Sequence, residues 1–157
     1  MIKKIFLIKF IILILASCGY SPMLSQNSDL NFMIVDYELK GDSQINKLIE
    51  NRLDKYSSTN SDKKFKIKID TNYNKITAVR DLTGKITNLK LITKLDLIYT
   101  IDNSGQKRES KKVSFSESVT IVKNENNYEQ DKYETIVVKN MSELLLNKLI
   151  LFLSRAQ

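Results

Sequence analysis

Apolar and polar residues alternate strictly in the middle of the chain. Three lysines (Lys64, Lys66, Lys68) alternate with three large apolar residues (Phe65, Ile67, Ile69). This period of two is typical of a strand with one buried face, and it slips near Lys75 and Ile76. Two later segments repeat it, with apolar faces at Leu89, Leu91, Leu95, Leu97, Tyr99 and Ile101, and at Val113, Phe115, Val119 and Ile121.

Turn signals separate these strands, and an earlier segment predicts another strand. The segments 80–84 (Arg-Asp-Leu-Thr-Gly) and 102–105 (Asp-Asn-Ser-Gly) predict turns, the second of them a hairpin turn. Residues 32–39 are rich in β-formers. The sequence therefore predicts four strands.

Two segments follow a helical period instead. After the break and N-cap signal at Gly41-Asp42-Ser43, apolar residues recur at Ile45, Leu48, Ile49, Leu53 and Tyr56, which predicts a helix over 43–56. A second helix is expected over 128–154. Its apolar stripe consists of Tyr133, Ile136, Val137, Met141, Leu144 and Leu145.

The order β-α-β-β-β-α predicts an α+β domain over residues 31–157: a four-stranded mixed sheet with two helices packed on one face. We expect these residues to be buried: Ile67, Leu95, Leu97, Val113, Phe115, Ile136, Val137 and Leu144. The other sheet face carries Lys64, Lys66 and Lys68, and hydroxyls at Ser114, Ser116, Ser118 and Thr120. This face is either solvated or a wet interface, and the apolar end of the last helix is either core or interface.

The N-terminus has the pattern of an export signal. Lys3 and Lys4 precede an apolar run, Ile5 to Ala16, that only Lys9 interrupts. The run is shorter than the ~20 residues that span a bilayer. We therefore expect residues 1–17 to be a leader that is removed.

The leader ends in Leu15-Ala16-Ser17-Cys18, which looks like a bacterial lipobox. Cys18 is the only cysteine, so no intramolecular disulfide partner competes for its thiol. Acylation of the thiol and the new amine would hold the chain firmly on a membrane, with residues 18–30 as lipidated cysteine and tether. The alternative is a plain secretory signal with an incidental cysteine.

The composition of the chain limits the partners and activities that can be expected of it. The formal charge is +7, and it falls to +4 once the three leader lysines are removed. This mild charge, without a block of five or six basic residues, does not indicate nucleic-acid binding. The chain lacks histidine, has four glycines and shows no phosphate loop or acid/base pair of carboxylates. We expect neither an enzyme nor a cofactor or metal site.

The joint pattern resembles the LPS-assembly lipoprotein LptE family. The resemblance rests on Cys18-Gly19-Tyr20, the helix segment 48–53, Arg80 to Lys85, the long strand 89–101, and residues 138–149. It implies an outer-membrane, periplasm-facing lipoprotein that plugs and helps assemble the lipopolysaccharide export barrel LptD. Gly19 suits that location, because an aspartate there favours inner-membrane retention in enteric-type sorting.

The resemblance also implies lipopolysaccharide contacts at Arg80 and Lys85 in the turn, and at the start of the last helix. At the second place Gln130 falls near the expected position, and Lys132 is the nearest base. Arginine binds phosphate through a planar fork, although a solvated turn arginine is the alternative for Arg80. The alternative function is a lipid carrier with an apolar cavity, or an accessory subunit of another transporter.

Overall fold

The computed structural model describes residues 32–57, 61–101 and 109–156, all within one compact unit, Asn31–Gln157. The leader, Cys18, the tether and the expected hairpin turn at 102–105 lie outside the described residues. In chain order the elements are β1 (Met33–Gly41), α2 (Ser43–Ser57), β2 (Lys64–Arg80), β3 (Ile86–Ile101), β4 (Ser110–Val122) and α3 (Asn127–Arg155). The predicted order β-α-β-β-β-α is confirmed.

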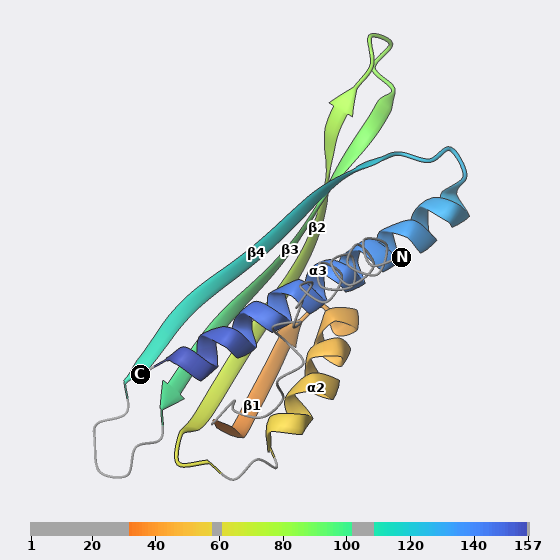
Figure 1. The fold of residues 1–157 in the computed structure, drawn as a ribbon. Helices are drawn as coiled ribbons and strands as arrows, with labels where there is room; N and C mark the ends of the chain where they lie inside the picture. The colour runs from red at the N-terminus through yellow and green to blue at the C-terminus, as the bar shows by residue number, and fades with distance from the viewer. Residues whose placement is uncertain (1–31, 58–60, 102–108, 157) are drawn as a thin grey trace, which may run out of the picture. The chain divides into compact units, whose positions relative to one another are not determined.

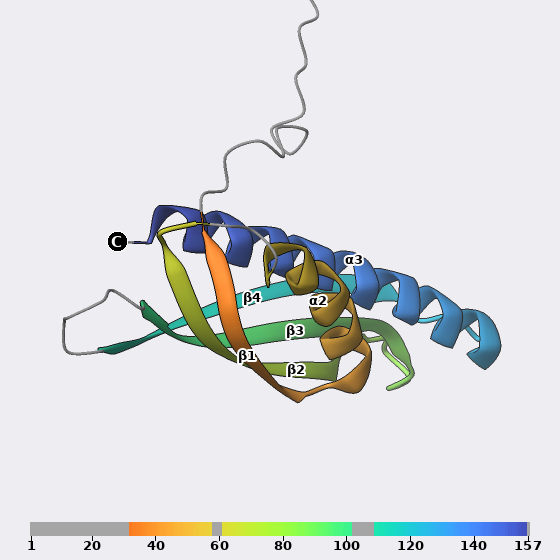
Figure 2. The same cartoon turned by 90° about the horizontal axis from the view of Figure 1, so that it is seen from below.

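The four strands form one mixed sheet in the order β1-β2-β3-β4. β1 runs parallel to β2, whereas the β2–β3 and β3–β4 pairs are antiparallel. Both helices cover the same face of this sheet, and the other face is bare (Figures 1 and 2). The predicted α+β architecture is therefore confirmed.

The crossover from β1 to α2 depends on Gly41 and Asp42. Asp42 caps the helix: its Oδ1 accepts hydrogen bonds from the backbone N–H groups of Gln44 and Ile45, both at 3.0 Å. Gly41 has a φ of 93°, and a Cβ there would lie 1.8 Å from the carbonyl oxygen of Thr71. Only glycine fits where the crossover passes this close to β2.

The β2–β3 hairpin extends beyond the rest of the sheet (Figure 1). β2 continues through the slip at Lys75 and Ile76 to Arg80, with register shifts around Val79. β4 pairs with β3 only from Asn88 onward, so the end of the hairpin has no third strand beside it. The apolar residues Ile76 and Val79 of β2 lie beyond the last pair with β1, at Thr71, and both are exposed.

The core between sheet and helices has two parts. One is a chain of aromatic contacts, in which each ring meets the next at centroid distances of 5.1–6.0 Å: Tyr56, Phe32, Phe65, Tyr99, Phe152 and Phe115. The other lies toward the hairpin and consists of Leu89, Leu91, Ile121, Val137 and Met141. The buried residues of α2, Ile45, Ile49 and Leu53, complete the core beneath the first helix.

Four of the eight burial predictions hold and four need correction. Ile67, Leu95, Leu97 and Val137 are buried, while Val113 and Phe115 are only half-buried. Ile136 and Leu144 are exposed, as is Tyr133 of the same expected stripe.

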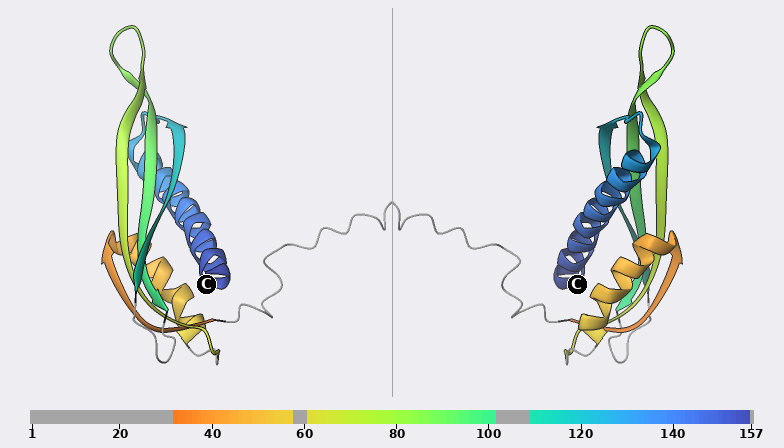
Figure 3. Two further views of the ribbon diagram at one scale, coloured as in Figure 1. Left: turned by 90° about the vertical axis from the view of Figure 1, so that its left-hand side faces the viewer. Right: turned by 90° about the vertical axis from the view of Figure 1, so that its right-hand side faces the viewer.

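The corrections in α3 have a geometric cause. The helix crosses the sheet obliquely (Figure 3), from Tyr73 on β2 at its N-terminal end to Phe115 on β4 at its C-terminal end. Its buried face therefore follows the residues Gln130, Glu134, Val137, Met141, Leu145, Leu149 and Leu153, with Ser142, Leu146 and Ile150 beside them. Ile136 and Leu144 each lie one position before a buried residue, about 100° away around the helix.

Candidate ligand-binding turn

The turn between β2 and β3 is held by one carboxylate. Oδ1 of Asp81 accepts hydrogen bonds from the backbone N–H of Thr83 (2.9 Å), its hydroxyl (2.7 Å) and the backbone N–H of Lys85 (3.0 Å). The hydroxyl bond from Thr83 is the largest cause that lowers the pKa of Asp81. Gly84 supplies the positive φ of 84° that closes the turn. The turn is thus ordered by its own residues.

Arg80 and Lys85 stand at the two ends of this turn. Nη1 of Arg80 donates a hydrogen bond to the carbonyl oxygen of Gly84 at 2.8 Å, so the guanidinium lies across the turn. Nζ of Lys85 pairs with Oε1 of Glu125, in the β4–α3 connection, at 2.6 Å. The hydrogen bond raises the pKa of Lys85 and lowers that of Glu125. Both predicted residues of the turn are therefore brought together, but Lys85 is partly neutralised.

Leu82 lies between these bases at the tip of the turn and is fully exposed. Leu82 was not among the site residues predicted from the sequence. The available signal was a large apolar residue inside a polar turn, between Asp81 and Thr83, where no strand or helix face could bury it. The tip thus combines an apolar side chain with two cationic ones.

Lys132 is exposed on α3, and among the described residues no hydrogen bond or ion pair joins it to the turn. Gln130, which stands near the expected second contact, is only 5% exposed. Its side chain accepts a hydrogen bond from the backbone of Asn124 (2.5 Å) and donates one to Oε1 of Glu134 (2.8 Å). Gln130 therefore anchors the base of α3 and is not available to a ligand.

Glu134 is the centre of this buried network. In addition to the hydrogen bond from Gln130, Glu134 accepts two at its Oε2. Nζ of Lys75 donates one at 2.8 Å, and the hydroxyl of Tyr73 donates the other at 3.4 Å. Burial acts to raise the pKa of Glu134, but the hydrogen bonds from Lys75 and Gln130 outweigh it and leave the pKa lowered. Desolvation, followed by the charge of Glu134, raises the pKa of Tyr73 to about 12. The network fixes α3 on β2 beside the hairpin.

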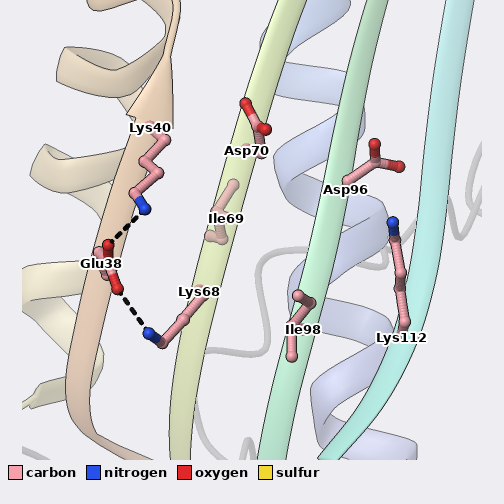
Figure 4. Close-up of a pocket in the computed structure, with 8 residues that line it drawn as sticks. All are labelled: Glu38, Lys40, Lys68, Ile69, Asp70, Asp96, Ile98 and Lys112. Atoms are coloured by element: carbon pink, nitrogen blue, oxygen red, sulfur yellow. Dashed lines mark ion pairs between the residues drawn. The ribbon is translucent and has the colours of Figure 1, made fainter.

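The bare sheet face carries mixed charges around a recess of about 230 Å³ (Figure 4). Glu38 pairs there with Lys68 at 2.8 Å and with Lys40 at 3.0 Å. The hydrogen bond from Lys68, and then that from Lys40, lowers the pKa of Glu38 to about 2. Lys68 therefore belongs to an ion-paired, exposed face. Beside it, Asp96 accepts hydrogen bonds from Lys94 (2.8 Å) and from the hydroxyl of Ser114 (2.6 Å).

Two further features of the described residues concern membranes and metals. Neither α2 nor α3 combines the length and hydrophobicity needed to cross a membrane. In the same part of the chain no three His, Cys, Asp or Glu side chains are grouped so that they could hold a metal ion.

Comparison with known proteins relates the fold to bacterial lipoproteins. No family model and no curated protein matches the sequence. Among solved structures, rare lipoprotein B from Shewanella oneidensis matches with a TM-score of 0.50 and 13% identity, over 74% of this chain and 90% of that one. Lipoprotein B from Nitrosomonas europaea matches with a TM-score of 0.50 and 8% identity, over 78% and 84%. At such identities the likeness shows a shared fold.

Proposed function

We propose that this chain is an outer-membrane lipoprotein of the LptE type. It is anchored through Cys18, helps the export barrel LptD to assemble, plugs it, and binds lipopolysaccharide during insertion into the outer leaflet. The observation that carries the ligand-binding part is the ordered β2–β3 turn, which presents Arg80 and Lys85 on either side of the exposed Leu82. The lipoprotein fold of the structural neighbours supports the anchoring part.

The turn suits a phosphorylated, acylated ligand. Arg80 uses one N–H on Gly84, and its planar fork has other donors that can bind a phosphate. Leu82 adds an apolar contact of the kind that acyl chains offer. Because Asp81 orders the loop before any ligand arrives, little conformational entropy is lost on binding.

Two features favour a plug over a lipid carrier. The side chains between sheet and helices pack closely: Leu91, Leu97 and Leu149, for example, are 0% exposed. A carrier needs an apolar cavity in that place. The bare sheet face, with its paired charges and its hydroxyls on β4, suits a wet interface with a polar barrel lumen.

The ligand test is a titration of lipopolysaccharide onto the Arg80→Gln/Lys85→Gln double variant. We expect a roughly tenfold or greater loss of affinity, because a hydrogen bond to a charged group contributes about 1.5–3 kcal/mol. Affinity for the unaltered protein should also fall as ionic strength rises. Lys132→Gln should have a smaller effect.

Two matched variants sharpen this test. Lys64→Gln/Lys66→Gln removes the same charge from the bare sheet face and should leave the affinity unchanged. Glu125→Gln releases Lys85 from its ion pair and should strengthen binding. Unchanged affinity in a folded Arg80→Gln/Lys85→Gln protein would show that the turn is only solvated.

The anchor and the partner are tested separately. Cys18→Ser should leave an uncut precursor, and a processed, membrane-bound form of this variant would refute lipidation. A detergent pull-down of the unaltered protein, with mass identification of what it retains, should recover the barrel. Retention of an inner-membrane transporter instead would favour the accessory-subunit function.

A further inference from the structure

Three exposed aliphatic side chains gather on the bare face of the sheet near the hairpin. In the strand register Val79 stands opposite Asn88, and Asn88 stands opposite Val122. Ile76 stands opposite Lys90, in the neighbouring row. Residues directly opposite each other point to the same side of a sheet, and the alternation along β3 places this side on the face that carries the recess. Ile76, Val79 and Val122 therefore form one surface, the aliphatic patch.

The helices and β1 leave the aliphatic patch uncovered. Both helices lie on the other face of the sheet, and β1 pairs with β2 only as far as Thr71 (Figures 1 and 2). Contiguous exposed apolar side chains mark binding sites, whereas isolated ones need no explanation. Arg80 is the next residue after Val79, and Leu82 stands at the tip of the turn. The patch is thus continuous with the candidate ligand-binding turn.

The charges around the patch favour an anionic ligand. The last three rows that span β2, β3 and β4 on this face contain one base and no acid: Asn74, Ile92 and Ser118; Ile76, Lys90 and Thr120; Val79, Asn88 and Val122. Within the described part of the chain, the ammonium of Lys90 makes no ion pair or hydrogen bond. Farther along the same face, in contrast, Lys40 and Lys68 are both paired with Glu38. An anionic group at the patch therefore meets an unpaired cation.

We propose that the aliphatic patch holds acyl chains of the same phosphorylated glycolipid whose phosphates bind Arg80 and Lys85, and that Lys90 contacts a further anionic group of it. This proposal rests on the proposed function, because it takes the turn as the phosphate site. Acyl chains match the patch, whereas the polar interior wall of a barrel does not. The bare face thus has two parts: an ion-paired part that suits the barrel lumen, and an aliphatic part that suits the chains of the ligand.

Two double variants of the full-length protein, in nonionic detergent, test the patch. Ile76→Thr/Val79→Thr keeps β-branched side chains in the hairpin and makes the patch more polar. Its control, Ile98→Thr/Val35→Thr, changes the same two residue types toward the other end of the sheet. The exposed fractions are closely matched, at 43% and 49% in the patch and 40% and 44% in the control. Circular dichroism should show that both variants fold.

The titration uses two probes: lipopolysaccharide, and lipopolysaccharide whose acyl chains have been removed. We expect Ile76→Thr/Val79→Thr to bind the intact probe about tenfold more weakly, a change of about 1.4 kcal/mol. This is about the effect of two methylene groups that lose an apolar contact. The deacylated probe should bind this variant and the unaltered protein equally well. The control variant should match the unaltered protein on both probes.

The charge variant and the ionic strength give a second comparison. Arg80→Gln/Lys85→Gln should weaken the binding of both probes, because it removes contacts to phosphate. At about 1 M salt this loss should shrink, since exposed charges are then screened. The tenfold loss in Ile76→Thr/Val79→Thr should persist at the same salt concentration, because an apolar contact is not screened.

The outcomes separate the patch from the turn. If the unaltered protein binds both probes equally, the patch holds no acyl chains and the proposal is overturned, while the phosphate site at Arg80 and Lys85 stands. The proposal is also overturned if Ile76→Thr/Val79→Thr binds lipopolysaccharide as tightly as the unaltered protein does. Loss of a barrel from a pull-down of that variant would then assign the patch to a protein contact. A protein that binds neither probe refutes the proposed ligand and the patch together.

Discussion

Leu144 and Leu145 are neighbours in the sequence, yet the structure gives them opposite environments: Leu145 is 1% exposed and Leu144 is 53% exposed. Substituting each with Ala removes the same three carbon atoms. At Leu145 the lost transfer free energy is about 2.4 kcal/mol, from about 0.8 kcal/mol per carbon group. The cavity left beneath α3 adds to this, so we expect a total loss within about 2–5 kcal/mol.

At Leu144 roughly half of the side chain is already in water, and its removal leaves no enclosed cavity. The expected loss is therefore about 1 kcal/mol or less. Urea unfolding followed by circular dichroism measures both values. The comparison requires that the free energy of unfolding falls with urea concentration at the same slope in both variants. A loss at Leu144 equal to or larger than that at Leu145 would show that the buried face of α3 is wrongly assigned.

Gly41→Ala should prevent stable folding, because its Cβ would overlap the carbonyl oxygen of Thr71. Gly84→Ala has open space around its Cβ and should lose only about 1–2 kcal/mol of stability, from its positive φ. Thermal unfolding compares the two variants, and similar melting points would contradict the close approach at Gly41. Glu134 has a lowered pKa when folded, so its contribution to stability is present above the ordinary glutamate pKa and is lost as the pH falls below that range. Glu134→Gln should therefore flatten the acid limb of the stability profile, and an unchanged limb would refute the role of the network. The pKa of Tyr73 is raised to about 12, so the stability that it contributes is complete below its ordinary pKa of 10.0 and declines as the pH rises from there toward 12. Absorbance titrations of the unaltered protein and of Tyr73→Phe should differ by one phenol that ionises above the ordinary tyrosine pKa.

Local periodicity predicted three of the strands, both helices and their order, because these elements show a buried face in their own residues, whereas the first strand was predicted from its β-forming residues. Lys64–Ile69 and Ile45–Leu53 are examples. Periodicity could not decide which side of α3 is buried. The helix carries apolar residues around much of its surface, and only its oblique path from Tyr73 to Phe115 selects Leu145 over Leu144.

The candidate site was predictable in the same limited sense. Arg80 and Lys85 are close in sequence, so a turn brings them together, whereas the pairing of Lys85 with Glu125 depends on a connection 40 residues away. The burial of Gln130 depends on contacts with Glu134 and with the backbone of Asn124. Such tertiary partners leave no periodic signal in the sequence.

The position of α3 after all four strands has a consequence for how the protein reaches its folded state. Its 29 residues cover parts of β2, β3 and β4, and they leave the ribosome after all four strands. Until they are present, the inner face of the sheet, which includes Leu95 and Leu97, lacks the cover that α3 provides. A nascent chain that still lacks α3 therefore exposes apolar surface to which chaperones can bind.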